Sequence, residues 1–286
     1  MAKLPFMQPV VVGLALLFGG AIAIVATMQQ KQVATPHHPH HDHHSSTATQ
    51  HHSGGAPNTH AELVNAPTPP PQQATTFTLA IRSHSGEAVT QFERFQEELM
   101  HLIIVSDDFQ VFQHLHPRYL GDGQFQVTTT LPQGGGYTLI ADYKPTGANE
   151  TVAMIPIAAQ GAAPSPPAPT AQTTQVIGTT TVELKLPQPL KAGSAVEVAF
   201  RLRDAATQQA VTDLRPYLGE AGHLVILRET TPLKPVDYLH AHAVDRQPKE
   251  TVRFMTQFPT PGRYKLWAQF QRGEQIVTAP FWVTVN

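Results

Sequence analysis

The chain has 286 residues, of which 41% are hydrophobic and 14% charged, and its 19 basic and 21 acidic residues give a formal net charge of −2. Because no long basic run occurs, nucleic acid is not expected as a partner. The absence of cysteine excludes disulfides, thiolate nucleophiles, iron–sulfur clusters and Cys-ligated zinc or blue-copper sites. The length predicts about two domains.

A short tail, residues 1–8, precedes an apolar segment at residues 9–28, and residues 10–28 of that segment carry no charge. At about 1.5 Å per helical residue its length approaches the thickness of a bilayer core, which predicts a transmembrane anchor. The small residues Ala21 and Ala23 leave a cleaved signal peptide as the alternative. Under either interpretation we expect a protein of the cell membrane or its exterior, single-pass if uncleaved, with its bulk in the periplasm or extracellular space.

Residues 29–74 are rich in His, Pro, Thr, Ser and Ala, a composition that cannot pack a core and predicts a disordered tether. Neutral imidazoles bind Cu(II), Ni(II) and Zn(II), and a flexible chain can wrap several of them around one ion. A polar spacer that binds metal only incidentally is the alternative. The tether histidines are His37, His38, His40, His41, His43, His44, His51, His52 and His60.

Two blocks of strand-like sequence, residues 75–159 and 176–286, are separated by a Pro/Ala/Thr linker at residues 160–175. Apolar residues alternate with polar ones at residues 77–81 and 196–202, as in half-buried strands. Short apolar runs punctuated by Gly and Pro, without a long helical period, predict an all-β fold of two sandwiches.

The two blocks repeat one another. Sliding the chain against itself by 122 residues (223 − 101) aligns His101 with His223, and an offset of 126 (240 − 114) aligns His114 with His240. A period of this length indicates duplicated domains. Nine of the 16 histidines lie in the tether, which leaves seven, and six of these occupy three equivalent positions in two copies. The six are His101, His114, His116, His223, His240 and His242.

Strand geometry predicts that each set of three shares one sheet face. Residues i and i+2 of a strand point to the same side, as do His114 and His116. In an antiparallel hairpin turning near residues 106–110, the residue numbers of two opposed residues always add up to the same value. His101 therefore lies on the same face as His114 and His116 if that sum is 215 or 217. In the second copy the corresponding sum must be 463 or 465. Its hairpin loop is four residues longer, around Pro232 and Pro235, and we expect the extra residues to extend into solvent.

Three imidazoles without cysteine suit Cu(II) or Zn(II), so the repeated histidines predict a metal site in each copy, with copper preferred. Met100 and Met255 lie nearby in sequence, and we expect them to fill the core. The alternative is that the histidines are strand residues on a polar face, kept by duplication for packing alone.

Residues 92–117, FERFQEELMHLIIVSDDFQVFQHLHP, resemble the YtkA-like and FixH-like β-sandwiches of bacterial periplasmic or secreted proteins. So do DLRPYLGEAGHLVIL at residues 213–227, YLHAHAV at 238–244 and FPTPGRYKLWAQF at 258–270. The resemblance covers both blocks and implies an immunoglobulin- or cupredoxin-like sandwich. It also implies copper handling or a respiratory complex as partner, with the six repeated histidines as the matching motif positions. The second copy has Ala243 where the first has Pro117.

We therefore expect a membrane-anchored extracytoplasmic protein that captures a metal ion, copper by preference, through its tether and holds it or hands it over at the histidine clusters. Zinc and nickel are the alternative metals. The competing hypothesis is a protein-interaction module that holds a membrane protein, with the tether as a spacer. No Gly-rich phosphate loop, nucleophile elbow or His-Glu-x-x-His helix is present, so we do not expect an enzyme.

Overall fold

The structure is a computed structural model that describes residues 58–166 and 170–286. The predicted tail, the apolar segment at residues 9–28 and the tether up to residue 57 lie outside the described residues, as do the tether histidines other than His60. Within these two described ranges, no helix has the length and hydropathy that crossing a bilayer requires.

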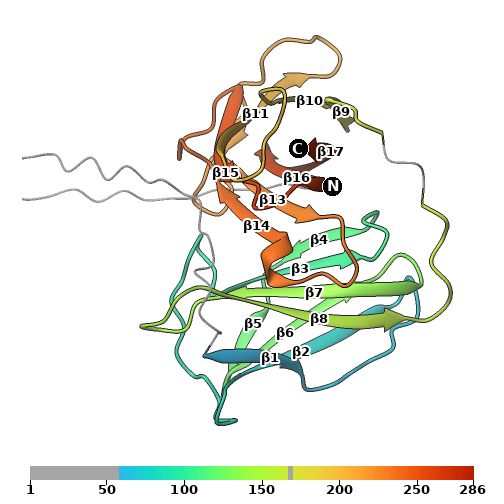
Figure 1. Cartoon of the computed structure of the whole chain (residues 1–286), viewed down its shortest axis with the longest axis vertical. Helices are drawn as coiled ribbons and strands as arrows, with labels where there is room; N and C mark the ends of the chain where they lie inside the picture. The colour runs from blue at the N-terminus through green and yellow to red at the C-terminus, as the bar shows by residue number, and fades with distance from the viewer. Residues whose placement is uncertain (1–57, 167–169) are drawn as a thin grey trace, which may run out of the picture. The chain divides into compact units, whose positions relative to one another are not determined.

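The first half of the chain folds into two sheets of four strands, in the orders β1-β2-β6-β5 and β4-β3-β7-β8 (Figure 1). Its neighbouring strands all pair antiparallel. The strands are β1 (Thr59–Leu63), β2 (Ala74–Ser83), β3 (Met100–Ser106), β4 (Phe112–Leu115), β5 (Arg118–Gly121), β6 (Gln124–Thr130), β7 (Gly135–Tyr143) and β8 (Thr151–Ala159).

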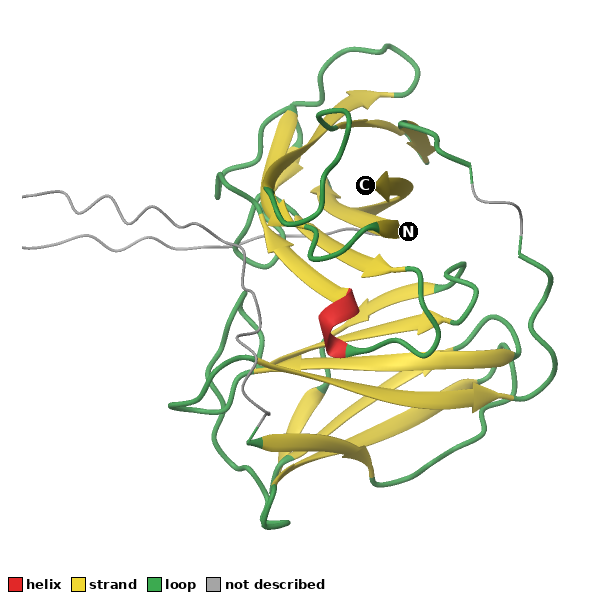
Figure 2. Cartoon of the chain, in the orientation of Figure 1, coloured by secondary structure: helices red, strands yellow, loops and turns green. Residues whose placement is uncertain are grey.

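The second half repeats this plan with sheets β15-β11-β10-β9 and β12-β16-β13-β14, where β17 also pairs with β16. The short 3-10 helix η1 (Pro235–Asp237) precedes β14 (Figure 2). The strands are β9 (Thr174–Ile177), β10 (Thr180–Lys185), β11 (Ala195–Asp204), β12 (Leu214–Arg215), β13 (His223–Arg228), β14 (Tyr238–His242), β15 (Thr251–Gln257), β16 (Gly262–Arg272) and β17 (Gln275–Val285).

The predicted all-β fold with two repeated sandwiches is confirmed. The order β4-β3-β7-β8 of the first sandwich returns as β14-β13-β16-β17 in the second, and β1-β2-β6 returns as β10-β11-β15. The strands that carry the repeated histidines, β3 with β4 and β13 with β14, are therefore equivalent pairs within one architecture.

The first sandwich begins earlier than the sequence analysis places it. Strand β1 lies inside residues 29–74, which were assigned to the tether, and Ala61 and Leu63 pack against the first core while pairing with β2. Strand β9 likewise starts within the predicted linker. Both strands contribute only two or three inward side chains, so their alternation is too short to stand out from the Pro-rich sequence around them.

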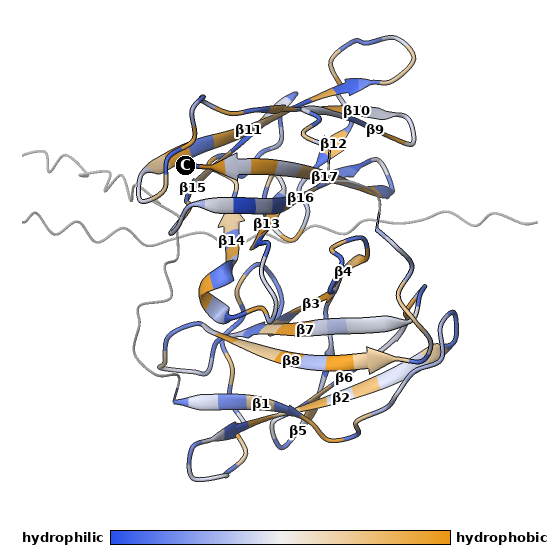
Figure 3. Ribbon diagram, turned by 45° about the vertical axis from the view of Figure 1, so that its right-hand side comes forward, coloured by the Kyte–Doolittle hydropathy of each residue, from blue (hydrophilic) through white to orange (hydrophobic). Residues whose placement is uncertain are grey.

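The central strands β3 and β13 of the histidine-bearing sheets are buried on both faces, because the two sandwiches belong to one compact unit and touch each other. In β3, Leu102 and Ile104 face the first sandwich core, whereas Ile103 and Val105 face a separate apolar cluster that includes residues of the second sandwich. Figure 3 shows apolar segments on strands of both sandwiches. The interface core comprises Ile103, Val105, Phe109, Ile140, Val152, Val225, Leu227, Tyr238 and Trp267.

The longer loop before β14 is exposed at Pro232 and Pro235, as expected, but it also contacts the first sandwich. Leu233 packs against the interface core, and residues 230–233 line a cavity of about 110 Å³ together with Asp107 and Phe109 of the first sandwich. The physical reason is the apolar area of Leu233, which gains by leaving water once a second sandwich lies within reach.

Candidate metal site between the two sandwiches

The strand register brings the repeated histidines to one face, as the index sums require. Leu102 pairs with Leu115, which gives a sum of 217, and His223 pairs with His242, which gives 465. Both sums are odd and lie in the predicted sets, so the parity prediction is confirmed for both copies. The face in question is the one that carries Ile103 and Val105, the face turned toward the other sandwich.

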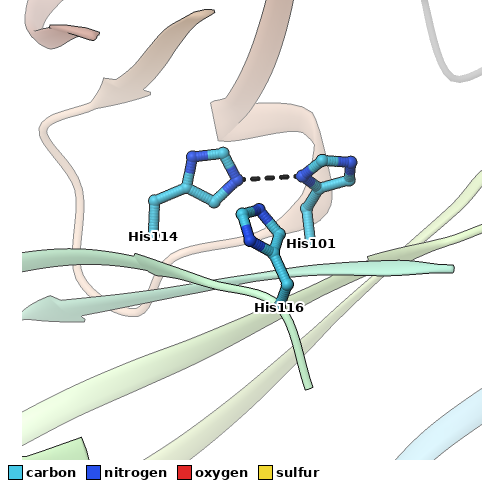
Figure 4. A group of neighbouring side chains, drawn as sticks. All are labelled: His101, His114 and His116. Atoms are coloured by element: carbon cyan, nitrogen blue, oxygen red, sulfur yellow. Dashed lines mark hydrogen bonds between the residues drawn. The ribbon is translucent and has the colours of Figure 1, made fainter. Parts of the chain in front are cut away.

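The three histidines of the first sandwich point toward one another (Figure 4). His101 Nδ1 lies 2.9 Å from His114 Nε2, and the ring centre of His116 is 5.1 Å from that of His101 and 4.9 Å from that of His114. One donor atom from each ring lies within 4.8 Å of the other two. We call these three residues the first cluster.

The second sandwich forms a looser version, the second cluster, from His223, His240 and His242. His223 Nδ1 lies 3.4 Å from His240 Nε2, and the ring centres of His240 and His242 are 5.5 Å apart. Among the described residues, the donor atoms of the first cluster lie within 4.8 Å of one another, whereas those of the second cluster do not form such a group. The repeat therefore preserves the inner pair more closely than the third histidine.

A matching turn orients the innermost ring of each cluster. Residues 95–98 and 217–220 both form tight turns whose two central residues have positive φ, 48° and 67° in the first and 51° and 76° in the second. The carbonyl of Phe95 accepts the Nε2 hydrogen of His101 at 3.1 Å, and the carbonyl of Tyr217 accepts that of His223 at 2.9 Å. Left-handed backbone at non-glycine residues carries strain, and here both copies retain it at the turn that holds the histidine.

The second ring of each pair is held from the opposite sandwich. His114 Nδ1 donates to Oε1 of Gln269 at 2.7 Å, and His240 Nδ1 donates to Oδ2 of Asp142 at 3.2 Å. Asp142 pairs with His101 across β3 and β7, while Gln269 pairs with His223 across β13 and β16. The two acceptors thus occupy equivalent positions, and each sandwich supplies the acceptor for its partner's histidine.

Asp142 and Gln269 were not predicted from the sequence as site residues. Each is a polar residue in the middle of an otherwise apolar strand, β7 or β16, and the two align at an offset of 127 (269 − 142). A polar residue at the same position of both repeats could have marked Asp142 and Gln269 as candidate site residues. The sequence does not reveal that the side chain of each contacts the other sandwich.

The inner rings of both clusters face each other. The ring centre of His101 is 5.5 Å from that of His240 and 6.2 Å from that of His223. The ring centre of His114 is 5.8 Å from that of His223 and 6.1 Å from that of His240. The predicted pair of separate sites is therefore one continuous group of imidazoles at the junction of the sandwiches.

Burial keeps five of the six imidazoles neutral near pH 7. Desolvation, followed by repulsion from neighbouring histidines, lowers the pKa of His101 and His223, and both side chains are 0% exposed. Desolvation also lowers the pKa of His114 to about 4 and lowers the pKa of His116 and His242. A neutral imidazole offers a lone pair, so the cluster is in the protonation state that metal binding requires.

Two carboxyl groups, buried Asp142 and half-buried Glu150, lie next to His240 of the second cluster. Asp142 is 0% exposed, and it accepts hydrogen bonds from His240 and from the hydroxyl of Tyr238 at 3.1 Å. Burial raises the pKa of Asp142, and burial together with repulsion from Asp142 raises the pKa of Glu150. This places acidic groups directly next to a histidine that is itself a candidate ligand.

The other candidate residues lie elsewhere. Met100 is buried in the first sandwich core, on the face of β3 opposite His101, as expected of a core residue. Met255 lies on β15, in the sheet that does not carry the second cluster. His60 lies on β1, and the remaining tether histidines are outside the described residues.

The sequence matches the family described as "Domain of unknown function (DUF8832)" over residues 56–160 and again over residues 174–286. No curated protein matches the chain. The two matched segments coincide with the two sandwiches, including β1 and β9.

Several solved structures are similar at low identity. A mutant of Salmonella alpha-2-macroglobulin is 12% identical with a TM-score of 0.28, over 81% of this chain and 15% of that chain. Fibronectin(III)-like modules of Clostridium thermocellum CbhA are 9% identical with a TM-score of 0.23, over 79% of this chain and 92% of that chain. The D00-D0 domain of intimin is 11% identical with a TM-score of 0.22, over 80% of this chain and 99% of that chain.

Proposed function

The chain belongs to the DUF8832 family, and we propose that it is a metal-binding protein whose principal site is the first cluster, with copper as the metal. Three imidazole nitrogens without a thiolate suit Cu(II) and Zn(II). Copper is preferred because Cu(II) binds nitrogen donors more tightly than Zn(II) does.

The observation that carries the proposal is the pair of acceptors that face the outer nitrogens of His101 and His114. The outer nitrogen of each ring faces an acceptor, the Phe95 carbonyl or Gln269 Oε1, and so holds that ring's single hydrogen. The inner nitrogens, 2.9 Å apart, then both carry lone pairs. Two lone pairs at that separation repel, whereas a cation bound between them would turn the repulsion into ligation.

Two further features fit the same interpretation. The Nε2 atom of His116 is buried and has no hydrogen-bond partner, which is costly unless something binds it. The outer-nitrogen contacts are the arrangement by which proteins commonly orient metal-binding histidines, since they fix the tautomer and aim the free nitrogen. The Gln269 amide orientation is assigned from its hydrogen bonds, Oε1 to His114 and Nε2 to Thr278.

The wider role that we propose is capture and delivery of copper outside the cytoplasm. The apolar segment at residues 9–28 would hold the protein at the membrane, and the histidine-rich tether would collect ions and pass them to the sandwiches. The resemblance to YtkA-like and FixH-like proteins, through the motif around His101 and His114, supports a place among copper-handling or respiratory partners. The role is one of binding and not of catalysis.

A thermal-stability measurement tests the site apart from the tether. The protein used is the full chain with the eight tether histidines that precede β1 replaced by serine, the tether-substituted chain. The positions replaced are His37, His38, His40, His41, His43, His44, His51 and His52. At a hundredfold excess of Cu(II) or Zn(II) over Kd, binding should stabilise it by about 2.7 kcal/mol.

The variant His114→Ala with His240→Ala should lose this stabilisation, whereas His84→Ala, an exposed histidine outside both clusters, should retain it. An unchanged melting temperature of the tether-substituted chain with both metals would remove the proposal. The interaction module would then be the better account of the repeated histidines.

A further inference from the structure

The interface between the sandwiches is close to symmetric under exchange of the two repeats. Ile103 and Val105 correspond to Val225 and Leu227 at the same offset of 122, and all four contribute to the interface core. A contact surface in which equivalent residues meet reciprocally is the arrangement of a two-fold dimer, here within one chain.

The polar contacts follow the same exchange. His114 receives its acceptor from β16 of the second sandwich, and His240 receives its acceptor from β7 of the first. Neither inner pair of imidazoles is therefore fully oriented by its own sandwich. Each half of the histidine group depends on the docked position of the other half.

The donor atoms divide into two sets. The first cluster gathers three donors within 4.8 Å, and the histidines of the second sandwich lie outside that group. In the second cluster the inner nitrogens of His223 and His240 are 3.4 Å apart. That is about the separation of two nitrogens bound to one ion at about 2.0–2.1 Å with a near-tetrahedral angle. One ion cannot bind both sets at once, but two ions can.

We propose that the two clusters form a single two-metal centre shared between the sandwiches, with one copper ion on each side of the interface. The inference rests on the proposed metal-binding function and extends it. His101, His114 and His116 hold the first ion. His223 and His240 hold the second, with His242 as the adjacent third donor. The inner rings of opposite clusters are 5.5 to 6.2 Å apart between centres, so the two ions would lie on the order of 4–6 Å from each other.

Carboxyl groups that would supply counter-charge to two neighbouring cations lie at the site. Asp142 contacts His240 directly, and Glu150 lies next to Asp142. Buried cations need such groups, because attraction to an acidic partner offsets part of the loss of hydration. The equivalent position beside His114 holds the neutral Gln269, so the two halves of the centre differ in charge and the second ion lies on the more acidic side.

Electron paramagnetic resonance of Cu(II) distinguishes this centre from isolated sites. The tether-substituted chain should bind two Cu(II) per chain, and magnetic coupling between them should reduce the integrated signal below that of two independent ions or give a half-field transition. The variant His223→Ala with His240→Ala should bind one Cu(II) and show an uncoupled spectrum that integrates to one spin. The control His84→Ala, which leaves both clusters intact, should still bind two Cu(II) and show the coupled spectrum.

Each result has a defined meaning. Two bound ions with uncoupled spectra would overturn the shared centre, and so would a single ion per chain that depends on the first cluster, although the proposed function would then stand. No bound ion would contradict both the function and the inference. The spectrum of the chain with both clusters intact decides the question even if the double variant fails to fold.

Discussion

At the scale of single residues, the site depends on which nitrogen of each ring carries the hydrogen. Phe95 and Tyr217 fix this for one histidine of each pair through backbone carbonyls, and Gln269 and Asp142 fix it for the other. An acceptor of this kind raises the basicity of the ligating nitrogen and holds its ring in the binding orientation. These contacts are therefore expected to affect metal affinity although they do not touch the ion.

Replacing Gln269 with leucine should weaken Cu(II) binding by the tether-substituted chain about 10- to 100-fold, because His114 loses the acceptor that orients it. The metal-free protein should also lose on the order of 1–3 kcal/mol of stability, the cost of leaving a buried donor unpaired. Isothermal titration and chemical denaturation measure the two effects. The control Gln275→Leu, at an exposed position, should leave both unchanged, and equal affinity in Gln269→Leu would show that the contact does not support binding.

The lowered histidine pKa values predict that acid destabilises the metal-free protein. His114 has a pKa of about 4 in the folded chain against 6.5 when unfolded, so between these values the unfolded chain binds more protons and stability rises with pH. Its contribution is complete above pH 6.5 and is lost as the pH falls toward 4, a change on the order of 3 kcal/mol. The pKa is lowered in the same direction at His101, His116, His223 and His242.

The raised pKa values of Asp142 and Glu150 act in the opposite sense, since these carboxyls stabilise the folded state as they become protonated in acid. Because the histidines with a lowered pKa outnumber the two carboxyls, we expect a net loss of stability on acidification. Denaturant unfolding of the metal-free chain at pH 7 and at pH 4.5 measures it. Equal or greater stability at pH 4.5 would mean that the histidines are not buried as described.

At the scale of elements, the sequence could predict which histidines share one face of a sheet. A two-residue period and an antiparallel hairpin were enough to place His101, His114 and His116 on one face, and the registers of β3–β4 and β13–β14 agree. The alternation of side chains along a strand does not predict which part of the protein covers that face. The uninterrupted apolar run after His101, whose alternate residues serve two different cores, was the available sign that both faces are buried.

One strand and one loop contact escaped prediction for related reasons. Strand β1 is five residues long and lies in a Pro-rich stretch, so its pairing with β2 and its packing decide its structure more than its local pattern does. The loop before β14 is exposed at Pro232 and Pro235, as its length and prolines predict. The packing of its Leu233 against the interface core depends on the other sandwich, which sequence alone does not reveal.

A register test at this scale separates the metal site from the fold. Inserting one glycine between Leu239 and His240 should turn His240 and His242 away from the interface and remove Cu(II) binding by the second cluster. Inserting one glycine between Gly273 and Glu274, at the turn between β16 and β17, should leave binding intact. Copper-to-protein ratios after gel filtration, with circular dichroism as the folding control, report both. Unchanged binding in the first variant would mean that the register of β14 does not determine the site.

At the scale of the whole described unit, the interface core joins metal binding to the docking of the sandwiches. Phe112 of β4 stacks on Trp267 of β16 with ring centres 4.7 Å apart, and Phe109 lies 6.4 Å from the same indole. Aromatic side chains at such a junction supply much of its free energy. The acceptors Asp142 and Gln269 reach their histidines only while this packing holds.

The substitution Trp267→Ala should cost about 3–5 kcal/mol, through lost burial and the cavity that it leaves. It should also weaken Cu(II) binding at both clusters, although Trp267 is not a ligand. Hydrogen exchange of the amides of Ile103 and Val225 should become faster, while Leu79 in the first sandwich core remains protected. Faster exchange throughout both sandwiches would instead indicate that the interface and the individual cores unfold together.

The central claim is that the repeated histidines at the junction of the sandwiches are metal ligands. X-ray absorption spectroscopy of the copper-loaded tether-substituted chain tests it most directly, because imidazole rings give a characteristic outer-shell scattering pattern that can be counted. We expect nitrogen neighbours at about 2.0 Å and two to three imidazoles per copper ion. A spectrum dominated by oxygen ligands, with one imidazole or none per copper ion, would contradict the account.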